Sequence, residues 1–212
     1  MGVSELGRLV GAARGTVHKQ LTGLVEAGWV EQDLEGRYGL TLTAAAVGNA
    51  ALAQQGLGRH VHEALEALVT ETGETASIAA LYRNQTRIVQ RAESDHILHA
   101  DIRVGTTFPL SIGASSHVLA TFALTEAQRE AMRAAGVALP SDEVIQRTRA
   151  TGAARTVDEL QPGISAVSVP LRDPLRFKTF ALTLSAPNER MDFPRHEEAL
   201  RRARDRIQET RR

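Results

Sequence analysis

The sequence predicts an α+β protein with a small winged helix-turn-helix domain, a linker helix and a larger domain built on an antiparallel sheet. Three observations predict this fold class. An amphipathic helix followed at once by a short hairpin occupies residues 14–40, and an alanine-rich stretch follows at residues 43–55. The rest of the chain alternates between helical and strand patterns. We place the domains at residues 1–41, 42–57 and 58–212.

Residues 14–37 are predicted to form a helix, a turn and a two-stranded wing. The apolar residues of the helix follow a helical spacing and make one stripe: Val17, Leu21, Leu24 and Val25. Gly28 follows the last of them, as glycine often does just past a helix end. Residues 29–33 and 37–40 are expected to be strands joined by a turn at residues 35–36.

The opposite side of this helix is polar and cationic at its N-terminal end, which holds Arg14, Gly15, Thr16, His18 and Lys19. No acidic residue follows within the helix before Glu26. Such a helix fits the major groove of double-stranded DNA, where its N-terminal residues contact base edges and phosphates. Arg37 in the wing is placed to enter the minor groove. The alternative is an ordinary solvated helix face.

Composition limits the possible partners. The 212 residues include 25 Lys and Arg and 25 Asp and Glu, so the formal net charge is zero. This balance argues against a general nucleic-acid coat but allows a specific binder with local cations, which we expect to act as a dimer. The absence of Cys excludes disulfides and thiolate metal sites. No apolar run approaches the ~20 residues of a membrane span, and no secretory signal is evident, so we expect a cytoplasmic protein without membrane partners.

A short helix at residues 5–10, capped by Ser4, is expected before the groove-facing helix, with Leu6, Leu9 and Val10 on its inner face. The string VSELGRLVGAARGTVHKQLTGLVEAGWVEQDLEGRYGL, residues 3–40, resembles the DNA-binding domain of the IclR family of transcription regulators. That family normally has a further helix before Val3, which covers the apolar side of the helix pair. The N-terminal helix is thus apparently missing here, so we expect Leu6, Leu9 and Leu24 to be partly uncovered and the DNA-binding domain to be weakened.

The elements of the remaining chain are predicted from periodicity and caps. Residues 43–55 form a linker helix that is alanine-rich and poor in charge, and we expect it to pack against a partner helix in a dimer. Further helices are expected at residues 59–71, 113–124, 126–135, 143–151 and 195–211, with Thr125 capping the third and Ser141 or Asp142 the fourth. Strands are expected at residues 75–82, 87–92, 97–104, 164–171 and 177–186.

Two features of this half suit a small anionic ligand. Residues 113–116, GASS, open a helix whose free N–H groups and dipole favour a carboxylate, and glycine lets a ligand approach the backbone. Thr183 and Ser185 alternate along a strand, so both hydroxyls point to one face. Alternatively, both are ordinary strand residues.

The strings PLSIGASSHVLATFAL, TGAARTVDELQPGISAVSVPLRD and FALTLSAP resemble the IclR effector-binding domain, in its order and rough spacing. The resemblance implies a GAF-like fold. It also implies an effector pocket lined by Gly113, Ala114, Ser115, Thr156, Ala166, Thr183 and Ser185. Thr156 stands where relatives often have an acid, and Ala166 where some have Cys. The pocket is therefore less polar, which favours a small organic acid with some apolar body.

The sequence favours neither an enzymatic site nor a metal site. Ser115, Ser116 and His117 are adjacent on one helix, so they cannot pair as nucleophile and base. His60 and His62 face different ways on a helix, while His96, His99 and Asp101 are a weak metal candidate. We expect no catalytic residues, no cofactor and no metal.

The sequence therefore predicts a ligand-responsive transcription regulator that binds a palindromic operator as a dimer. As the resemblance implies, the C-terminal domain would bind a small-molecule effector and assemble dimers into tetramers. The alternative is an N-terminally truncated, metabolite-binding oligomerisation module that no longer binds DNA.

Overall fold

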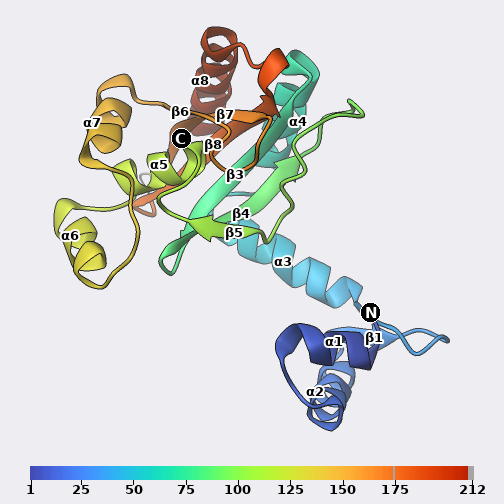
Figure 1. Cartoon of the computed structure of the whole chain (residues 1–212). Coiled ribbons are helices and arrows are strands. Elements are labelled where there is room, and N and C mark those ends of the chain that lie inside the picture. Colours follow the sequence, from blue (N-terminus) through green and yellow to red (C-terminus); the bar gives the residue numbers. More distant parts are fainter. Residues whose placement is uncertain (174, 210–212) are drawn as a thin grey trace. The chain divides into compact units, whose positions relative to one another are not determined.

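The computed structural model describes residues 1–173 and 175–209, and the chain divides into two compact units, Met1–Gly58 and Arg59–Arg212 (Figure 1). The first unit contains α1 (Val3–Val10), α2 (Arg14–Glu26), β1 (Val30–Gln32), β2 (Tyr38–Leu40) and α3 (Leu42–Gln54). β1 and β2 pair antiparallel and form the predicted wing, which follows the predicted helix pair in the chain. The linker helix α3 lies within this unit.

The core of the first unit is smaller than the sequence predicts. Val17 and Leu21 are buried with Val30, and Leu6 packs against them. Leu9 and Val10, predicted to face inward, are 69% and 63% exposed. Leu24 and Val25 of the predicted apolar stripe are also exposed. The expectation that Leu9 and Leu24 are partly uncovered in the absence of a further helix is confirmed, whereas the predictions for Val10 and Val25 were wrong. α1 and α2 cover each other along one side only, and no other described element covers the rest.

The cap of α1 also differs from the prediction. Gly2, not Ser4, is the N-cap residue, and its backbone N–H donates to the carboxylate of Glu5 at 3.4 Å. α3 begins one residue before the predicted start, and the hydroxyl of its N-cap residue Thr41 accepts from the backbone N–H of Ala44. α3 has no charged residue and no buried residue, so its apolar surface is unpartnered within the described chain.

The second unit is a six-stranded sheet in the order β5-β4-β3-β8-β7-β6, in which every neighbouring pair is antiparallel. The strands are β3 (Thr75–Tyr82), β4 (Gln85–Ala92), β5 (Thr107–Pro109), β6 (Ala154–Val157), β7 (Ile164–Asp173) and β8 (Lys178–Pro187). The long β3 and β8 pair at the centre although about a hundred residues separate them in the sequence. The fold of this unit therefore depends on a long-range contact.

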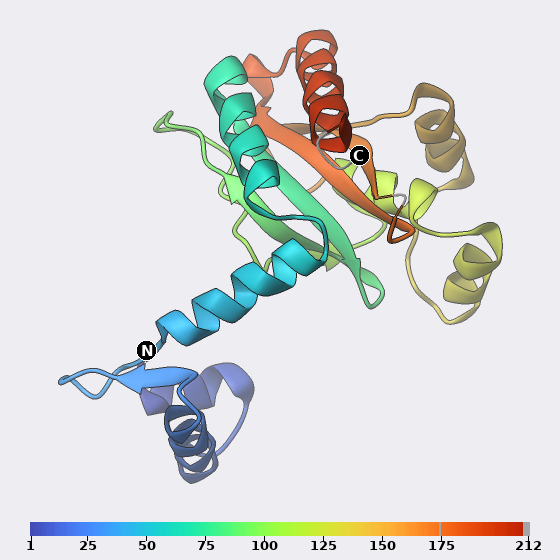
Figure 2. The same cartoon turned by 180° about the vertical axis from the view of Figure 1, so that it is seen from behind.

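Helices cover both faces of this sheet (Figures 1 and 2). α4 (Arg59–Thr72) and α8 (Phe193–Glu209) pack together on one face. α5 (Ala114–Phe122) packs on the other face against β7 and β8, with α7 (Asp142–Thr151) beside it. α6 (Glu126–Ala134) and the 3-10 helix Asn188–Arg190 complete the unit.

The predicted caps in this unit are confirmed. The Thr125 hydroxyl accepts from the backbone N–H of Gln128, whose side chain in turn accepts from the Thr125 N–H, a reciprocal capping box. Of the two candidate caps for α7, Ser141 rather than Asp142 takes the position and accepts from Val144 N–H. Local signals of this kind depend only on neighbouring residues, which explains why the sequence predicts them well.

Two strands were predicted wrongly. Residues 97–104 form no strand, and the edge strand is β5 further along the chain. The alternation at 97–104 misled because Asp101 forms ion pairs with Arg91 and Arg103, while Ile97 and Leu98 are exposed. β6, a short strand with two buried residues, was missed. The predicted helix at 195–211 is α8, and its last two predicted residues lie outside the described part of the chain. None of the described helices is long and apolar enough to cross a membrane.

His196 on α8 is buried, and its Nδ1 lies 3.2 Å from the Met191 sulfur. Burial lowers the pKa of His196 below its ordinary value of 6.5, because the charged imidazolium is poorly solvated there. Below about pH 6.5 the unfolded chain therefore binds a proton that the native chain does not, and stability falls with pH.

We therefore expect the free energy of unfolding to decrease as pH falls through and below 6.5. In the His196→Gln variant this decrease should be smaller, since glutamine does not titrate. Urea denaturation at a series of pH values, followed by circular dichroism, measures it. Identical pH profiles for parent and variant would show that His196 does not contribute.

Candidate functional site

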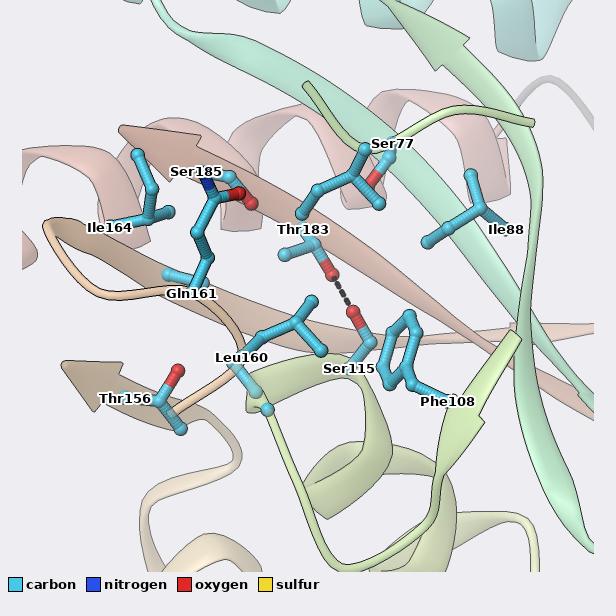
Figure 3. Close-up of a pocket in the computed structure, with 14 residues that line it drawn as sticks. Ser77, Ile88, Phe108, Ser115, Thr156, Leu160, Gln161, Ile164, Thr183 and Ser185 are labelled. Atoms are coloured by element: carbon cyan, nitrogen blue, oxygen red, sulfur yellow. Dashed lines mark hydrogen bonds between the residues drawn. The ribbon is translucent and has the colours of Figure 1, made fainter. Parts of the chain in front are cut away.

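A cavity between α5 and the sheet brings together all the pocket residues that the sequence singled out (Figure 3). Gly113, Ala114 and Ser115 come from the start of α5, Thr156 from β6 and Ala166 from β7. β8 contributes both Thr183 and Ser185. The structure adds residues that the sequence reasoning did not select: Ser77, Ile88, Ile102, Phe108, Leu160, Gln161 and Ile164.

The register of the sheet explains why these side chains meet. Thr156 on β6 lies opposite Ala166 on β7, which lies opposite Ser185 on β8. In the next row, Thr183 on β8 lies opposite Ser77 on β3. Residues directly opposite each other project on the same face, so both rows point toward α5. Alternation along β8 predicted the shared face of Thr183 and Ser185. No local signal in the sequence pairs β8 with β3, and Ser77 was missed for that reason.

Some of the hydroxyls on this face are used within the protein. Ser168 donates to the Leu182 carbonyl at 3.2 Å, so it accepts from Thr183, 2.8 Å away. Because a hydroxyl has one proton, Thr183 must in turn accept from Ser115 at 2.9 Å (Figure 3). The hydrogen bonds are therefore donated in one direction, from Ser115 on α5 to Thr183 on β8 and from Thr183 to Ser168 on β7. Ser115 and Thr183 join helix to sheet and have no proton left for a ligand.

Other hydroxyls lining the cavity have no partner. Ser77, Thr156 and Ser185 are 5%, 6% and 3% exposed. None of them makes a side-chain hydrogen bond within the described residues, although each lines the cavity. Buried polar groups are nearly always hydrogen-bonded, and leaving one unsatisfied costs about 1–3 kcal/mol. These three groups can still donate a proton, and they are therefore the features of the cavity that most directly suggest a bound ligand.

The start of α5 adds backbone donors to the same cavity. Gly113 is the N-cap residue with φ of +88° and ψ of +152°, a region that is essentially restricted to glycine. A Cβ at this position would lie 3.7 Å from a Phe108 ring carbon, an ordinary van der Waals contact, so the backbone angles rather than crowding favour glycine. The N–H groups of Ala114, Ser115 and Ser116 have no acceptor within the described chain. They and the helix dipole make this end of the cavity favourable for an anion.

One carboxylate of the protein already lies at this helix start. Oε2 of Glu159, from the loop between β6 and β7, accepts from Gly113 N–H at 2.9 Å. The same oxygen lies 3.4 Å from Nε2 of the buried His117. The loop is held at its base by Asp158, which accepts from Gly163 N–H at 2.6 Å and from the Asn188 amide at 2.9 Å. These two hydrogen bonds, the Asn188 one first, lower the pKa of Asp158.

The free volume of the cavity is about 20 Å³, which is room for about one water molecule. A metabolite requires more space, so part of the wall must move when one binds. The strands and α5 are buried in the core, whereas Leu160 and Gln161 belong to the loop that follows Glu159. The loop at residues 158–163 and the irregular segment between β4 and β5, which contributes Ile102, are therefore the parts of the wall that lie outside the strands and α5.

The structure shows no nucleophile–base pair at the Ser115-Ser116-His117 sequence. Ser116 donates to the Pro109 carbonyl and lies 2.7 Å from the Thr86 hydroxyl. Nε2 of His117 lies 3.3 Å from the Ser111 carbonyl. The two serine hydroxyls and the imidazole thus have different partners, and the arrangement does not activate either serine.

His96, His99 and Asp101, the weak metal candidate of the sequence, make other contacts in the structure. Nδ1 of His99 lies 2.7 Å from the His96 carbonyl, and its Nε2 lies 2.7 Å from Glu93. Asp101 pairs with Arg103 at 3.0 Å. Among the residues that the structure describes, no group of three or more His, Asp or Glu side chains could hold a metal ion.

In the first unit, all the predicted DNA-contacting residues are exposed. Arg14 and His18 line an open groove between α1, α2 and the wing, together with Arg8, which the sequence reasoning missed. Arg8 lies between the apolar residues Leu6 and Leu9 of a short helix, and only the fold places it beside α2. This groove presents Arg8 of α1 and Arg14 of α2 on one surface, together with the acid Glu5.

Arg37 is less available than the sequence suggests. Its guanidinium pairs with Asp33 at 3.1 Å and with Glu35 at 2.7 Å, both within the wing. The Arg37 backbone N–H, the largest cause, and its side chain lower the pKa of Asp33 and keep it ionised. A phosphate or base contact by Arg37 must therefore replace these ion pairs, which are exposed and individually weak.

Known protein families match both parts of the chain. Residues 49–210 match the family model for the C-terminal domain of the bacterial transcriptional regulator IclR, and residues 1–34 match the IclR helix-turn-helix domain. The glycerol operon regulatory protein of Streptomyces griseus is 28% identical over 200 residues, covering 90% of this chain and 79% of that protein.

Solved structures match over nearly the whole chain. HmgR of Pseudomonas aeruginosa is 25% identical with a TM-score of 0.80, covering 98% of this chain and 89% of that chain. An IclR homologue of Microbacterium hydrocarbonoxydans, complexed with 4-hydroxybenzoate, has a TM-score of 0.80 at 18% identity, again covering 98% and 89%. The predicted combination of a helix-turn-helix domain and a GAF-like effector domain is confirmed. Since both domains match in order, this chain belongs to the IclR family of bacterial transcriptional regulators.

Proposed function

We propose that this chain regulates transcription by binding an operator in double-stranded DNA and a small organic acid as effector. The observation that supports the effector proposal most strongly is the cavity under α5, where buried hydroxyls without partners face free backbone N–H groups. The protein acts as a binder in the cytoplasm, and we propose no catalytic step and no cofactor for it.

The cavity suits a particular chemistry. A carboxylate fits the N–H groups of residues 114–116, where the helix dipole also favours negative charge. Ser77 and Ser185 can donate to a hydroxyl or carbonyl at the other end of the ligand, because their protons are uncommitted. Apolar side chains between the two ends, among them Ile88 and Phe108, fit an apolar or aromatic body. The 4-hydroxybenzoate complex of the homologue makes aromatic acids a reasonable first probe.

DNA binding rests on the exposed start of α2. Arg14, Thr16, His18 and Lys19 are free of the core, and Arg8 of α1 extends the same cationic groove. A single DNA-binding domain with so few cations binds DNA weakly, so the proposal requires the DNA-binding domains of two chains, here called the two heads. The uncharged, exposed surface of α3 supports a homodimer made by this helix, and dimers of dimers remain part of the proposal. The effector acts by binding two arrangements of the heads with unequal affinity.

A second candidate is a metabolite-binding oligomerisation module without DNA binding. Two observations favour it: the ion pairs of Arg37 within the wing, and the exposed Leu9 and Val10 beside the small core of the first unit. The two candidates differ in one simple respect. Only the regulator selects a specific sequence from a random DNA pool.

The first prediction tests the DNA surface. Arg14→Ala and Lys19→Ala should each weaken binding to the selected sequence, and each lost phosphate contact should lower the salt slope by ~1. Gel-shift titrations at several salt concentrations measure both quantities. Arg147→Ala, an exposed change on α7, is the control and should leave both unchanged. If the two α2 variants behave like the control, α2 does not contact DNA.

The second prediction separates the ligand-facing hydroxyl from the structural one. Ser185→Ala should weaken binding of an acid found by thermal-shift screening by about two- to tenfold, since one hydrogen bond to an uncharged group is worth ~0.5–1.5 kcal/mol. Its effect on stability should be small, because Ser185 has no partner in the protein. Thr183→Val should instead lower the free energy of unfolding by ~1–3 kcal/mol, because it removes the acceptor of the Ser115 hydroxyl and leaves Ser168 with only its bond to the Leu182 carbonyl.

Calorimetry and urea denaturation of the same two variants provide both measurements. The reverse pattern, in which Ser185→Ala unfolds easily but binds normally, would contradict the assignment. A screen in which no organic acid raises the melting temperature would contradict the effector class itself.

A further inference from the structure

The loop between β6 and β7 holds a carboxylate at the one place where the proposed effector anion would bind. Glu159 accepts from Gly113 N–H, at the start of α5, and contacts His117 with the same oxygen. Gly113 lines the cavity, and the N–H groups of the next three residues have no acceptor in the described chain. The Glu159 side chain is more than a third exposed, whereas the His117 side chain is buried. A carboxylate reaching in from an exposed loop thus partly fills the role of a bound anion.

Two anions at one helix start repel each other, and the N–H groups that stabilise one are partly lost to the other. The helix start is not the only sign of a ligand here. The hydroxyls of Ser77, Thr156 and Ser185 are at least nine-tenths buried, without partners, and line the same cavity. The cavity therefore has unmet hydrogen-bonding capacity that Glu159 does not satisfy.

The loop that holds Glu159 also closes the cavity. Leu160 and Gln161 follow directly and form part of its wall (Figure 3). The free volume of about 20 Å³ has room for about one water molecule, so binding an organic acid requires part of this wall to move. The ends of the loop are held by Asp158 through Gly163 and Asn188. Movement of Glu159 can therefore open the middle of the loop while its ends stay in place.

We propose that Glu159 is an internal anion that holds the 158–163 loop closed over the empty pocket, and that the effector's carboxylate displaces it. This inference rests on the proposed organic-acid function. It assigns Glu159 a role in specificity. When Glu159 leaves, the start of α5 loses its interaction with a carboxylate. The carboxylate of an anionic ligand replaces that interaction, whereas a neutral ligand of the same shape forms a weaker one. The pocket therefore favours acids over their neutral analogues.

The test uses the full chain and the variants Glu159→Gln and Glu130→Gln. Glutamine keeps the size of the side chain but removes its charge, and Glu130 is an exposed acid on α6 that serves as the matched control. Without added acid, hydrogen–deuterium exchange should be about fivefold faster in Glu159→Gln over residues 157–164 and at the Gly113 amide. This corresponds to replacing a charge-assisted hydrogen bond with a neutral one. Elsewhere, and in Glu130→Gln, exchange should match the parent.

The second arm is calorimetry with 4-hydroxybenzoate and its neutral analogue 4-hydroxybenzamide. The parent should prefer the acid, and Glu159→Gln should bind the acid about fivefold more tightly than the parent does. Unchanged exchange in Glu159→Gln overturns the proposal that Glu159 holds the loop. Equal affinity of parent and Glu159→Gln for 4-hydroxybenzoate overturns the proposed displacement. Binding of neither compound to any variant contradicts the proposed function for this class of acid, while the exchange data decide the role of Glu159 on their own.

Discussion

The second unit depends on the way α5 begins against the sheet. Gly113 adopts a backbone conformation that other residues avoid, and this turn directs a short, almost entirely buried helix across β7 and β8. Ser115 in the first turn of α5 is then close enough to hydrogen-bond Thr183 on β8. One glycine conformation thus sets the position of the helix, the hydrogen bond that ties it to the sheet and the free N–H groups that face the cavity.

The hydroxyl groups near this helix are of two kinds: those that donate a hydrogen bond to another group of the protein, and those that do not. In Ser115, Thr183 and Ser168 the protons form one chain that ends on a carbonyl, which stabilises the contact between α5 and the sheet. The Ser77 and Ser185 hydroxyls make no side-chain hydrogen bond in the described chain and face a cavity with room for about one water molecule. Hydroxyls that the protein leaves uncommitted in one cavity are consistent with selection for binding there.

The sequence predicted the parts of this arrangement that depend on neighbouring residues. Alternation placed Thr183 and Ser185 on one face, and the GASS string placed a helix start at Gly113. It could not predict Ser77, because only the pairing of β3 with β8, distant in the chain, brings that residue to the cavity. Nor could it predict Glu159, whose role depends on a loop crossing to α5, or the pairing of Arg37 with acids of its own wing. The resemblance to a family gave pocket positions that alternation alone did not, such as Thr156 on the missed strand β6.

The central claim is that the start of α5 and the unpaired hydroxyls form one anion-binding pocket. Amide chemical shifts during titration with 4-hydroxybenzoate test it most directly. We predict that the largest saturating shifts fall on Ala114, Ser115 and Ser116, with smaller shifts at Ser77 and Ser185. Saturating shifts confined to other parts of the chain, with these amides unmoved, would contradict the account.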